Sequence, residues 1–417
     1  MKHKTIEEKK NIVILGGGFA GIRAALDLNN YLHDNSDYQI ILVDRKDYQC
    51  YHPGLYEAAT TEHGLVEVRR VKRTVAISLA QIFYKTKVKV FKAYIDRIAL
   101  ADGKVITDSR ILSFDYLVVA MGSIADFYDI PGLDKHGYPL KNLDEAIMIR
   151  NRIEEIVIKK DRAQFIIGGG GFAGTELAGE LHNLLKHECE DHGKKLENFK
   201  IIIVEGGMSF LGGLSEKVAK MVGERLTGMG VETRFSSLIT EAAADHIIIN
   251  MKDRINSDLL IWTGGVRSIR LPVDPPAGGD LAADKKDRII TTDFLNLKHS
   301  PNIFIAGDNL CFTDPATKKS NAQTGQEAVR HGALVAKNIF RLIKGRPLLP
   351  YSVGPTRFVI PVSGKYAILY TPNLLVVGFW GWLIRKGADL RYFWSVLPLW
   401  TALKYWLFEN KIFMKND

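Results

Sequence analysis

A six-residue sequence, Gly-Gly-Gly-Phe-Ala-Gly, occurs twice in this chain, at residues 16–21 and again at residues 169–174. Each copy follows an apolar run that predicts a strand and precedes residues with the apolar spacing of a helix. A strand, a glycine turn and a helix N-terminus bind the pyrophosphate of a dinucleotide, because the glycines let phosphate approach the backbone N–H groups closely. Two copies in matching contexts predict two dinucleotide sites and electron transfer between them.

An acidic residue ends the second apolar run of each predicted unit. Asp44 ends the run 38–44 and Glu205 ends the run 199–205. A carboxylate at this position accepts hydrogen bonds from the ribose hydroxyls of a dinucleotide. No Arg or Lys directly follows Glu205. We therefore expect the second site to bind NADH rather than NADPH, because the carboxylate would repel a 2′-phosphate.

Local patterns predict several further elements. The Asp-Gly pair at 102–103, within an alternating stretch, is typical of a hairpin. Apolar spacing predicts helices over residues 143–159 and 321–343, the second capped by Ser320 or Asn321.

Composition limits the class of protein. A length of 417 residues allows two or three domains, and the formal net charge is +9. No tract of Lys and Arg interleaved with aromatic residues is present, so we expect no nucleic-acid partner, and the charge instead suits an anionic lipid surface. The three cysteines lack CxxC spacing, which argues against a dithiol relay and favours a reducing, cytosolic compartment. We expect no metal site.

The C-terminal region is rich in tryptophan, with five of the six tryptophans between residues 380 and 406. Its apolar runs, 374–384 and 392–408, are shorter than the roughly 20 residues that a membrane span needs. Trp and Tyr beside Arg and Lys are typical of a segment in the membrane interface. We expect a membrane-surface segment here; the alternative is a helix that packs on the rest of the protein or on a dimer partner.

The arrangement resembles the flavoprotein superfamily with two dinucleotide-binding domains. In that superfamily the first glycine motif binds FAD, the inserted one binds NAD(P)H, and the chain then returns to complete the FAD domain. Residues 304–308 are similar to the returning element, which implies that Asp308 meets the ribityl chain of FAD. Residues 116–123 resemble the family's Ala-Thr-Gly turn, with Met121 in place of threonine.

Within that superfamily the chain is similar, over nearly its whole length, to type II NADH dehydrogenases, which are single-subunit NADH:quinone oxidoreductases. The segments that carry the resemblance are 44–56, 174–181, 262–266 and 325–332. The last is similar to the family's Ala-Gln-x-Ala-x-Gln-Gln-Gly motif of the quinone site. This implies that Gln326 lies at the flavin and the quinone, with Arg330 and His331 where the paired glutamines would be. Lys365 is a further candidate for the quinone pocket.

The resemblance implies an α/β fold with two Rossmann-like dinucleotide-binding domains, the second inserted in the first, plus a C-terminal membrane-associating segment. The implied domains are an FAD-binding domain of residues 1–130 and 285–350, an NADH-binding domain of residues 131–284, and a C-terminal membrane-surface or dimerisation region of residues 351–417. The expected FAD-binding residues are Gly16, Gly18, Phe19, Ala20, Gly21, Asp44, Arg45, Ala120, Gly122, Asp308 and Gln326. The expected NADH-binding residues are Gly169, Gly171, Phe172, Gly174, Glu176, Glu205, Gly264 and Gly265.

The implied reaction does not pump protons. A hydride passes from NADH to noncovalently bound FAD, and a membrane quinone is then reduced by two electrons. Glu176, expected in the first turn of its helix, and Gln326 are the candidate catalytic residues; Glu176 would orient NADH or deliver a proton to the quinone. The family is typically dimeric, so we expect a homodimeric, peripheral enzyme at the cytoplasmic face of the cell membrane.

Two other readings of the sequence are open. A sulfide:quinone oxidoreductase would use cysteines to relay sulfur, and this chain offers Cys50, Cys189 and Cys311. A protein of another class would hold FAD structurally and use NADH to switch partners, as a sensor or interaction protein.

Overall fold

The computed structural model describes residues 9–62, 67–212, 214–270, 272–274 and 282–414. Contacts between residues divide the chain into two compact units. The first unit comprises residues 1–49, 77–124 and 266–354, and the second unit comprises residues 50–76, 125–265 and 355–417. These bounds differ from the predicted domains, because residues 50–76 group with the second unit and the C-terminal region does not form a third unit of its own.

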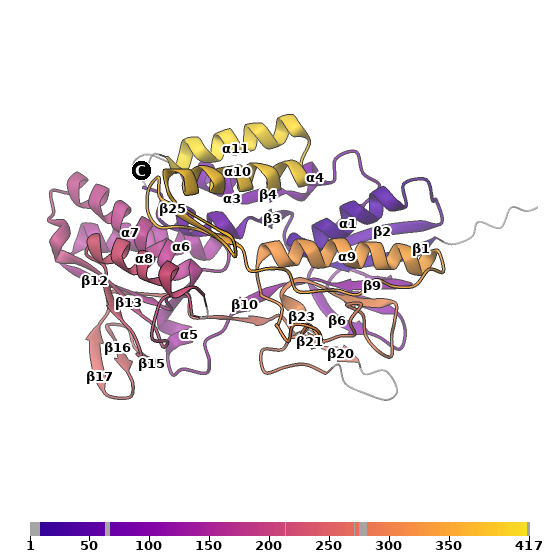
Figure 1. Ribbon diagram of the computed structural model, residues 1–417, viewed down its shortest axis with the longest axis horizontal. Helices are drawn as coiled ribbons and strands as arrows, with labels where there is room; N and C mark the ends of the chain where they lie inside the picture. The colour runs from indigo at the N-terminus through magenta and orange to yellow at the C-terminus, as the bar shows by residue number, and fades with distance from the viewer. Residues whose placement is uncertain (1–8, 63–66, 213, 271, 275–281, 415–417) are drawn as a thin grey trace, which may run out of the picture. The chain divides into compact units, whose positions relative to one another are not determined.

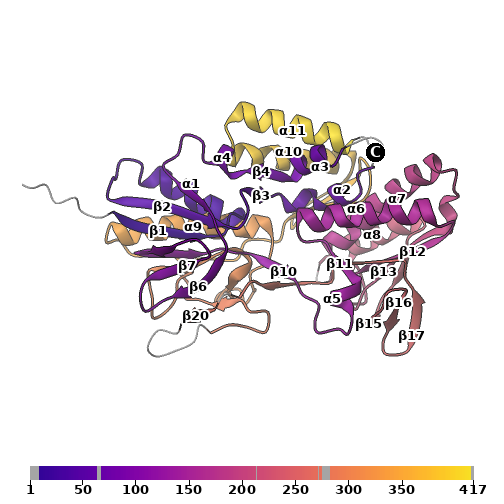
Figure 2. The ribbon, with the colours of Figure 1, turned by 180° about the vertical axis from the view of Figure 1, so that it is seen from behind.

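The first unit is built on a five-stranded parallel sheet. Its strands, in spatial order, are β22 (Ile303–Ile305), β9 (Tyr116–Val119), β1 (Lys10–Leu15), β2 (Tyr38–Asp44) and β5 (Lys89–Lys92). Residues 12–15 of β1 are fully buried, as expected for the central strand of a parallel sheet. Two helices, α1 (Phe19–Tyr31) and α9 (Gly325–Ile343), lie side by side (Figures 1 and 2). A Cβ atom on Gly332 would clash with the backbone oxygen of Ala20, so these helices approach each other backbone to backbone.

The second unit repeats this sheet. Its five parallel strands, in spatial order, are β11 (Gly137–Pro139), β18 (Leu259–Trp262), β12 (Ala163–Gly168), β13 (Phe199–Val204) and β14 (Glu232–Arg234). In each sheet the strand that enters the glycine motif is central, and the strand that ends at the acidic residue is its neighbour. The duplication therefore extends from six residues to a whole sheet. One edge strand differs between the two sheets in its place along the sequence. In the first sheet it is β22, which follows the other four strands in the sequence, and in the second sheet it is β11, which precedes the other four.

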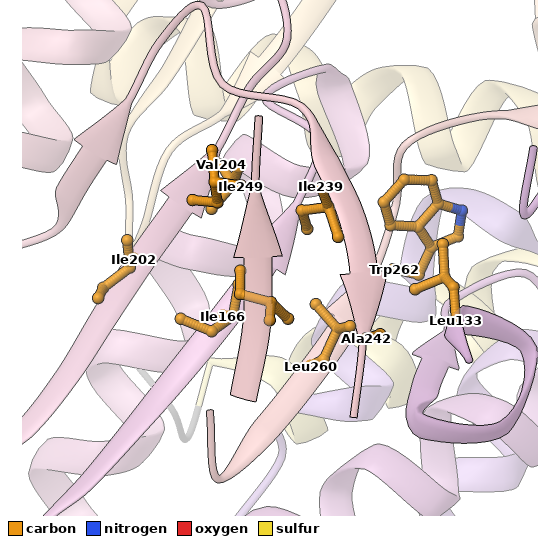
Figure 3. Close-up of a cluster of buried hydrophobic side chains, with 10 residues drawn as sticks. Leu133, Ile166, Ile202, Val204, Ile239, Ala242, Ile249, Leu260 and Trp262 are labelled. Atoms are coloured by element: carbon orange, nitrogen blue, oxygen red, sulfur yellow. The ribbon is translucent and has the colours of Figure 1, made fainter. Parts of the chain in front are cut away.

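An apolar cluster fills the space between the second parallel sheet and a three-stranded antiparallel sheet, β15 (Ile239–Ala242), β16 (His246–Ile249) and β17 (Asp253–Asn256) (Figure 3). Ile166 and Ile202 come from the parallel sheet, and Ile247 is fully buried against them. Each such side chain contributes roughly 1.5–3 kcal/mol of burial free energy. Trp262 joins the cluster, and its indole N–H donates to the carbonyl of Asp126 at 2.7 Å. The cluster therefore fixes the carboxyl end of β18, where the predicted Gly264 and Gly265 follow.

Several predicted elements are present. The hairpin at 102–103 joins β6 (Ile95–Ala99) to β7 (Lys104–Thr107), and β8 (Ile111–Ser113) pairs antiparallel with β7. A fourth strand, β20 (Val273–Asp274), pairs with β6 in parallel. The helix predicted over residues 143–159 is α6 (Leu143–Lys159), which begins with a capping box between Asn142 and Glu145.

The predicted start of the helix at 321 is wrong. This helix, α9, begins at Gly325 and is capped by the side chain of Thr324. The Asn321 side chain instead accepts from the backbone N–H of Phe312 at 2.9 Å and donates to the carbonyl of Leu310 at 3.1 Å. These two bonds hold residues 310–321 as a closed loop before the helix.

The C-terminal residues of the second unit form an antiparallel sheet and two long helices. The strands are β24 (Phe358–Pro361), β25 (Ala367–Thr371) and β26 (Leu374–Gly378), and the helices are α10 (Phe379–Val396) and α11 (Leu399–Phe413). These helices pack with α2 (Leu55–Ala59) and α3 (Val68–Val75), which belong to the same unit (Figures 1 and 2). Among the described residues, no helix combines the length and the apolar character that a membrane crossing requires.

Shorter elements complete the two units. In the first unit they are α4 (Leu79–Ile82), β19 (Val266–Ser268), β21 (Ile289–Ile290), η3 (Gly307–Asn309) and β23 (Leu310–Cys311). Three strands contain residues of both units: β3 (Tyr48–Cys50), β4 (Ala76–Ser78) and β10 (Ser123–Ala125). In the second unit the short elements are η1 (His52–Gly54), α5 (Leu133–His136) and η2 (Leu196–Asn198), and two longer helices are α7 (Phe172–Asp191) and α8 (Glu216–Gly228).

Candidate functional site

The two glycine loops have the same backbone geometry. Gly16 has φ +105° and Gly169 has φ +107°, a region that residues with a side chain rarely adopt. Their N–H groups donate to the carbonyls of Val43 and Val204 respectively, both at 2.8 Å. The last glycine of each motif lies so close to the first that a Cβ atom there would clash with its carbonyl oxygen. The repeated sequence therefore reflects a repeated steric requirement.

The strand-end carboxylates brace these loops. Asp44 accepts from the N–H of Gly17 at 2.6 Å and from that of Lys46 at 2.8 Å. Glu205 accepts from the N–H of Gly170 at 2.6 Å. Its second oxygen accepts from the N–H of Gly207, also at 2.6 Å. A carboxylate has about four lone-pair sites, so each retains acceptor capacity for ribose hydroxyls. The sequence predicted the ribose role of these residues and missed the bracing role.

The helices that follow the two glycine loops begin without a side-chain cap, as do several other helices of the described residues. The N-cap residues of α1 and α7 are Gly18 and Gly171, and neither provides a side-chain cap. By contrast, the side chains of Asn142 and Thr324 cap α6 and α9. A pyrophosphate at the N-terminus of either helix would supply oxygens that accept from first-turn N–H groups. The loops fit the cofactors that the sequence predicts.

The returning element lies against the first glycine loop. Asp308 hydrogen-bonds the hydroxyl of Ser123, and Asn309 accepts from the N–H of Gly122 at 2.9 Å. Asn309 is fully buried and also donates to the hydroxyl of Ser268 at 2.7 Å. The predicted Ala120 is buried too, and its N–H donates to the carbonyl of Leu15 at 2.8 Å, beside the loop.

Two further FAD candidates, Phe19 and Arg45, differ in exposure: Phe19 is half-buried and Arg45 is exposed. Phe19 begins α1, and a Cβ on Gly325 would lie 3.4 Å from its ring, so Phe19 adjoins the start of α9. Arg45 is exposed immediately after Asp44. Asn309 was missed by the sequence reasoning, although it directly follows the Gly-Asp pair that was singled out.

The second loop gathers its predicted residues in the same way. A Cβ on Gly169 would lie 2.8 Å from the Cα of Gly264, so the chain after β18 passes directly over the loop. Thr263, which the sequence reasoning missed, donates its hydroxyl to the carbonyls of Gly168 and Gly169 at 3.0 and 3.1 Å. Phe172 is exposed at the start of α7, with its ring edge-on to Phe358 at a centroid distance of 5.3 Å.

The quinone candidates on α9 have different surroundings. Gln326 is exposed in the first turn. Arg330 donates to the carboxylate of Glu327 at 2.7 Å and to the carbonyl of Ser352 at 2.9 Å, so a neighbouring carboxylate compensates its charge. His331 is only 1% exposed, and burial lowers the pKa of its imidazole to about 4. Of the three, Gln326 alone presents an open side chain.

Lys365 lies in an exposed bend after β24. The bend is tied to α7, because Glu180 accepts from the N–H of Gly364 at 3.1 Å and Ser363 hydrogen-bonds Asn183 at 3.1 Å. The Lys365 side chain itself is exposed.

Glu176 lies in the second turn of α7, so its predicted place in the first turn is wrong. Part of its surface remains accessible, yet the surrounding protein desolvates the carboxyl. That desolvation, together with the nearby Glu57, raises the pKa of Glu176 to about 8, and Arg385 opposes the rise. Glu176 therefore holds a proton at neutral pH.

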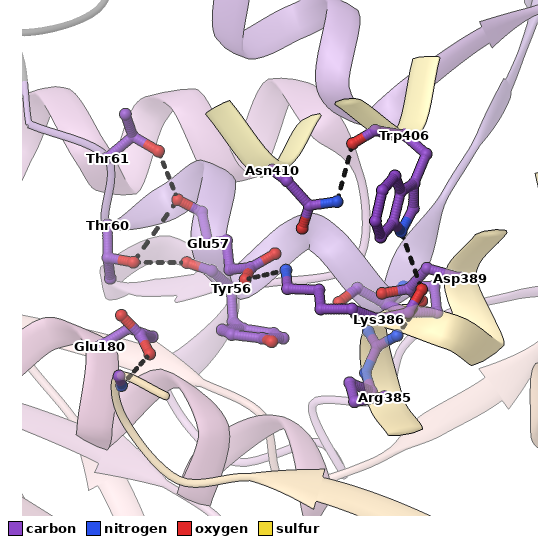
Figure 4. A network of polar contacts seen from close by, with 12 residues as sticks. Tyr56, Glu57, Thr60, Thr61, Glu180, Arg385, Lys386, Asp389, Trp406 and Asn410 are labelled. Atoms are coloured by element: carbon purple, nitrogen blue, oxygen red, sulfur yellow. Dashed lines mark hydrogen bonds and ion pairs between the residues drawn. The ribbon is translucent and has the colours of Figure 1, made fainter. Parts of the chain in front are cut away.

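A buried polar network links α2 to the C-terminal helices (Figure 4). The ammonium of Lys386 pairs with the carboxylate of Glu57 at 3.3 Å, and Lys386 is 5% exposed. Arg385 pairs with Asp389 and donates to the carbonyl of Pro53 at 3.1 Å. This network was not predicted from the sequence. The signal available in the sequence was the charged residues that stand between and directly after the apolar runs 374–384 and 392–408.

Glu409 adds a buried carboxyl to this network. It is 1% exposed, and one of its oxygens has no hydrogen-bond partner among the described residues. Burial raises the pKa of Glu409 to about 8, although the charge of Lys386 opposes the rise. The carboxyl is therefore protonated at neutral pH.

Two of the three cysteines, Cys189 and Cys311, do not suit sulfur chemistry. Cys189 is buried on α7, and burial raises the pKa of its thiol to about 11. Burial also raises the pKa of Cys311. The thiolate is the reactive form, so these shifts oppose a nucleophilic role. Within the described ranges, no group of three His, Cys, Asp or Glu residues could hold a metal ion.

Known proteins are similar to this chain over the region that contains both parallel sheets. The sequence model of the pyridine nucleotide-disulphide oxidoreductase family matches residues 10–332. A type II NADH:quinone oxidoreductase of Staphylococcus aureus is 27% identical over 350 residues, which cover 81% of this chain and 84% of that relative. The solved structure of NDH2 from Plasmodium falciparum in complex with NADH has a TM-score of 0.82 at 16% identity, covering 96% of this chain and 97% of its own.

The sulfide:quinone oxidoreductase of Aquifex aeolicus is also similar in structure. Its TM-score is 0.76 at 18% identity, covering 93% of this chain and 91% of its own. At such identities the two solved structures support the fold alone.

Proposed function

This chain belongs to the pyridine nucleotide-disulphide oxidoreductase family, and from that premise we infer that it is an FAD-dependent NADH:quinone oxidoreductase of the type II class. The observation that carries this inference is the pair of braced glycine loops at the centres of two parallel sheets in which four of the five strands follow the same order. One loop alone would suit any dinucleotide enzyme, whereas two suit a resident cofactor and a nicotinamide substrate.

The first loop holds FAD in this proposal, and the second binds NADH. Bound FAD supplies the redox chemistry, because it accepts a hydride from NADH and returns two electrons to the quinone. The protein binds and orients: the N-termini of α1 and α7 hold the pyrophosphates, while Asp44 and Glu205 hold the riboses. Asp308 and Gln326 complete the FAD side, and Gln326 is also proposed at the quinone.

Glu176 is proposed as the group that holds a proton for the quinone. Reduction of a quinone to a quinol takes up two protons, and the hydride of NADH accounts for only one of them. A carboxyl with a pKa of about 8 is protonated at neutral pH and remains close enough to that pH to exchange its proton. The substitution Glu176→Gln should lower the rate with quinone and remove a pH-dependent step near pH 8. Unchanged rates at every pH would exclude this role.

Selectivity for NADH is proposed to rest on Glu205, and the duplication supplies a matched control. Glu205→Gln keeps an acceptor for the loop but removes the charge, so kcat/KM with NADH should fall about tenfold, the loss expected for a charge-assisted hydrogen bond. NADPH should lose less. Asp44→Asn makes the same change in the first loop and should weaken retention of FAD without altering the ratio of NADH to NADPH. Equal shifts of that ratio in both variants would contradict the assignment.

Peripheral membrane association is proposed from the C-terminal helices, which expose several large apolar side chains and bury several charged ones. Trp380, Trp394 and Trp400 are 65%, 60% and 73% exposed, whereas Lys386 and Glu409 are buried. A surface helix in water has the opposite arrangement. Exposed tryptophans beside cations suit the head-group region of a bilayer, where a lipid-soluble quinone is also found. We place this surface at the cytoplasmic face, and we propose a homodimer on the family resemblance.

One anaerobic experiment separates this function from its alternatives. NADH added to the yellow, FAD-loaded protein should bleach the visible flavin band, and sulfide should leave it unchanged. Bleaching by sulfide alone would select sulfide:quinone chemistry. Absence of bleaching by NADH would select a sensor or interaction protein.

A further inference from the structure

The short helix α3 carries a dense patch of positive charge. Arg69, Arg70, Lys72 and Arg73 are all exposed, while Val71, Thr74 and Val75 are buried beneath them. At 100° per residue the four cations span an arc of about 160°, so they share one side of the helix. The density of positive charge on these eight residues is far higher than the average over the chain, whose net charge is +9 over 417 residues.

Packing places this patch beside the tryptophan-bearing helices. The helix α3 packs on α11 within the second unit, and the guanidinium of Arg70 lies over the ring of Phe408 at 5.9 Å from its centroid. A Cβ on Gly54, at the end of η1, would contact both Val75 of α3 and Phe413 of α11. Thus α3 lies about one helix diameter, ~10 Å, from the axis of α11.

From this juxtaposition the geometry points to α3 as a binding surface for anionic lipid head groups, a surface separate from the C-terminal segment. The inference rests on the proposed membrane association. An interfacial helix places its apolar face about 5–10 Å into the boundary between head groups and acyl chains. A neighbour one helix diameter away then lies at the level of the phosphates. Arg391, Lys404 and Lys411 are also exposed on α10 and α11 and add positive charge to the same unit.

The expected effect follows from the charge count. Each Lys or Arg near an anionic surface strengthens partitioning about fivefold at physiological ionic strength. Removing three cations should therefore weaken binding to anionic vesicles about 100-fold. It should leave binding to neutral vesicles unchanged, since apolar burial does not depend on those charges.

The test uses the full-length, FAD-loaded protein and sedimentation with two kinds of vesicle, phosphatidylcholine alone and phosphatidylcholine mixed with phosphatidylglycerol. The variant Arg69→Gln/Lys72→Gln/Arg73→Gln keeps Arg70, which packs on Phe408. The control Lys200→Gln/Lys217→Gln/Lys220→Gln removes three exposed cations from β13 and α8, elsewhere on the same unit. Flavin bleaching by NADH should be the same in all three proteins and serves as the folding check.

Each outcome decides a separate question. Loss of the preference for phosphatidylglycerol in the α3 variant alone supports the inference. Equal loss in the control variant, or no loss in either, overturns it and leaves net charge or apolar contact as the cause. Binding of the unaltered protein to a soluble polyanion but to neither vesicle would overturn it in favour of a nucleic-acid or acidic-protein partner. Failure of the unaltered protein to bind any vesicle contradicts the proposed membrane association itself.

Discussion

The buried pair of Lys386 and Glu57 gives the sharpest single perturbation. The two side chains are 6% and 15% exposed, and the ammonium lies 3.3 Å from the carboxylate. Lys386→Met preserves most of the side-chain volume but leaves the carboxylate without its cation. Removing one partner of a buried ion pair costs about 3–5 kcal/mol, because an uncompensated charge stays in a medium that solvates it poorly.

The pH dependence of that cost can be worked out from Glu409. Its pKa is about 8 in the folded protein, against about 4.5 when exposed. Between these values the folded state holds a proton that the unfolded state has lost, so stability falls as pH rises through this window. Lys386 opposes the raised pKa, and its removal extends the window upward. The extra destabilisation of Lys386→Met should therefore be nearly constant between about pH 5 and pH 7 and should grow as the pH rises above about 8.

Urea denaturation of the FAD-loaded protein at several pH values measures this effect. Lys404→Met on α11 removes an exposed lysine and should change the free energy of unfolding by less than about 0.5 kcal/mol. The double variant Lys386→Met/Glu57→Gln should recover much of the loss, since neither charge then remains. A Lys386→Met variant as stable as the Lys404→Met control, or equally destabilised at about pH 6 and about pH 9, would refute the reasoning.

Three further changes test other parts of the structure. Gly332→Ala should force α9 away from Ala20 at a cost of about 1–3 kcal/mol and release FAD on dialysis, whereas Gly228→Ala, at the open end of α8, should be neutral or stabilising. Glu409→Gln should reduce the fall of unfolding free energy between pH 5 and 8, whose slope for one proton is at most about 1.4 kcal/mol per pH unit; an unaltered slope would show that this carboxyl does not titrate there. Asn142→Ala should remove the capping box of α6 and lower the melting temperature, by the equivalent of about 1 kcal/mol, without changing kcat.

The glycine motifs were predictable because their chemistry is steric and local. A positive φ and a contact between backbones leave glycine as the residue that fits, so the pattern is visible in the sequence. Repetition then made the pattern specific, and four of the five strands follow the same order in both sheets. The family and the cofactors followed from the same residues.

The remaining features depend on contacts between distant residues. Asn321 is a suitable N-cap by type, but its side chain is used by Phe312 and Leu310, so the helix begins later. The C-terminal sequence shows which residues are apolar, but it does not show which side of each helix faces the protein. Because apolar sides normally face inward, the buried Lys386 and Glu409 were missed.

Stopped-flow spectroscopy of the FAD-loaded protein, under anaerobic conditions, tests the central claim most directly. NADH is mixed first, and a short-chain quinone is added after the flavin band has bleached. The account predicts fast bleaching by NADH, slower bleaching by NADPH, and full recovery of the band with one quinone consumed for each NADH oxidised. Bleaching by NADH without recovery on adding quinone would contradict the assignment as an NADH:quinone oxidoreductase.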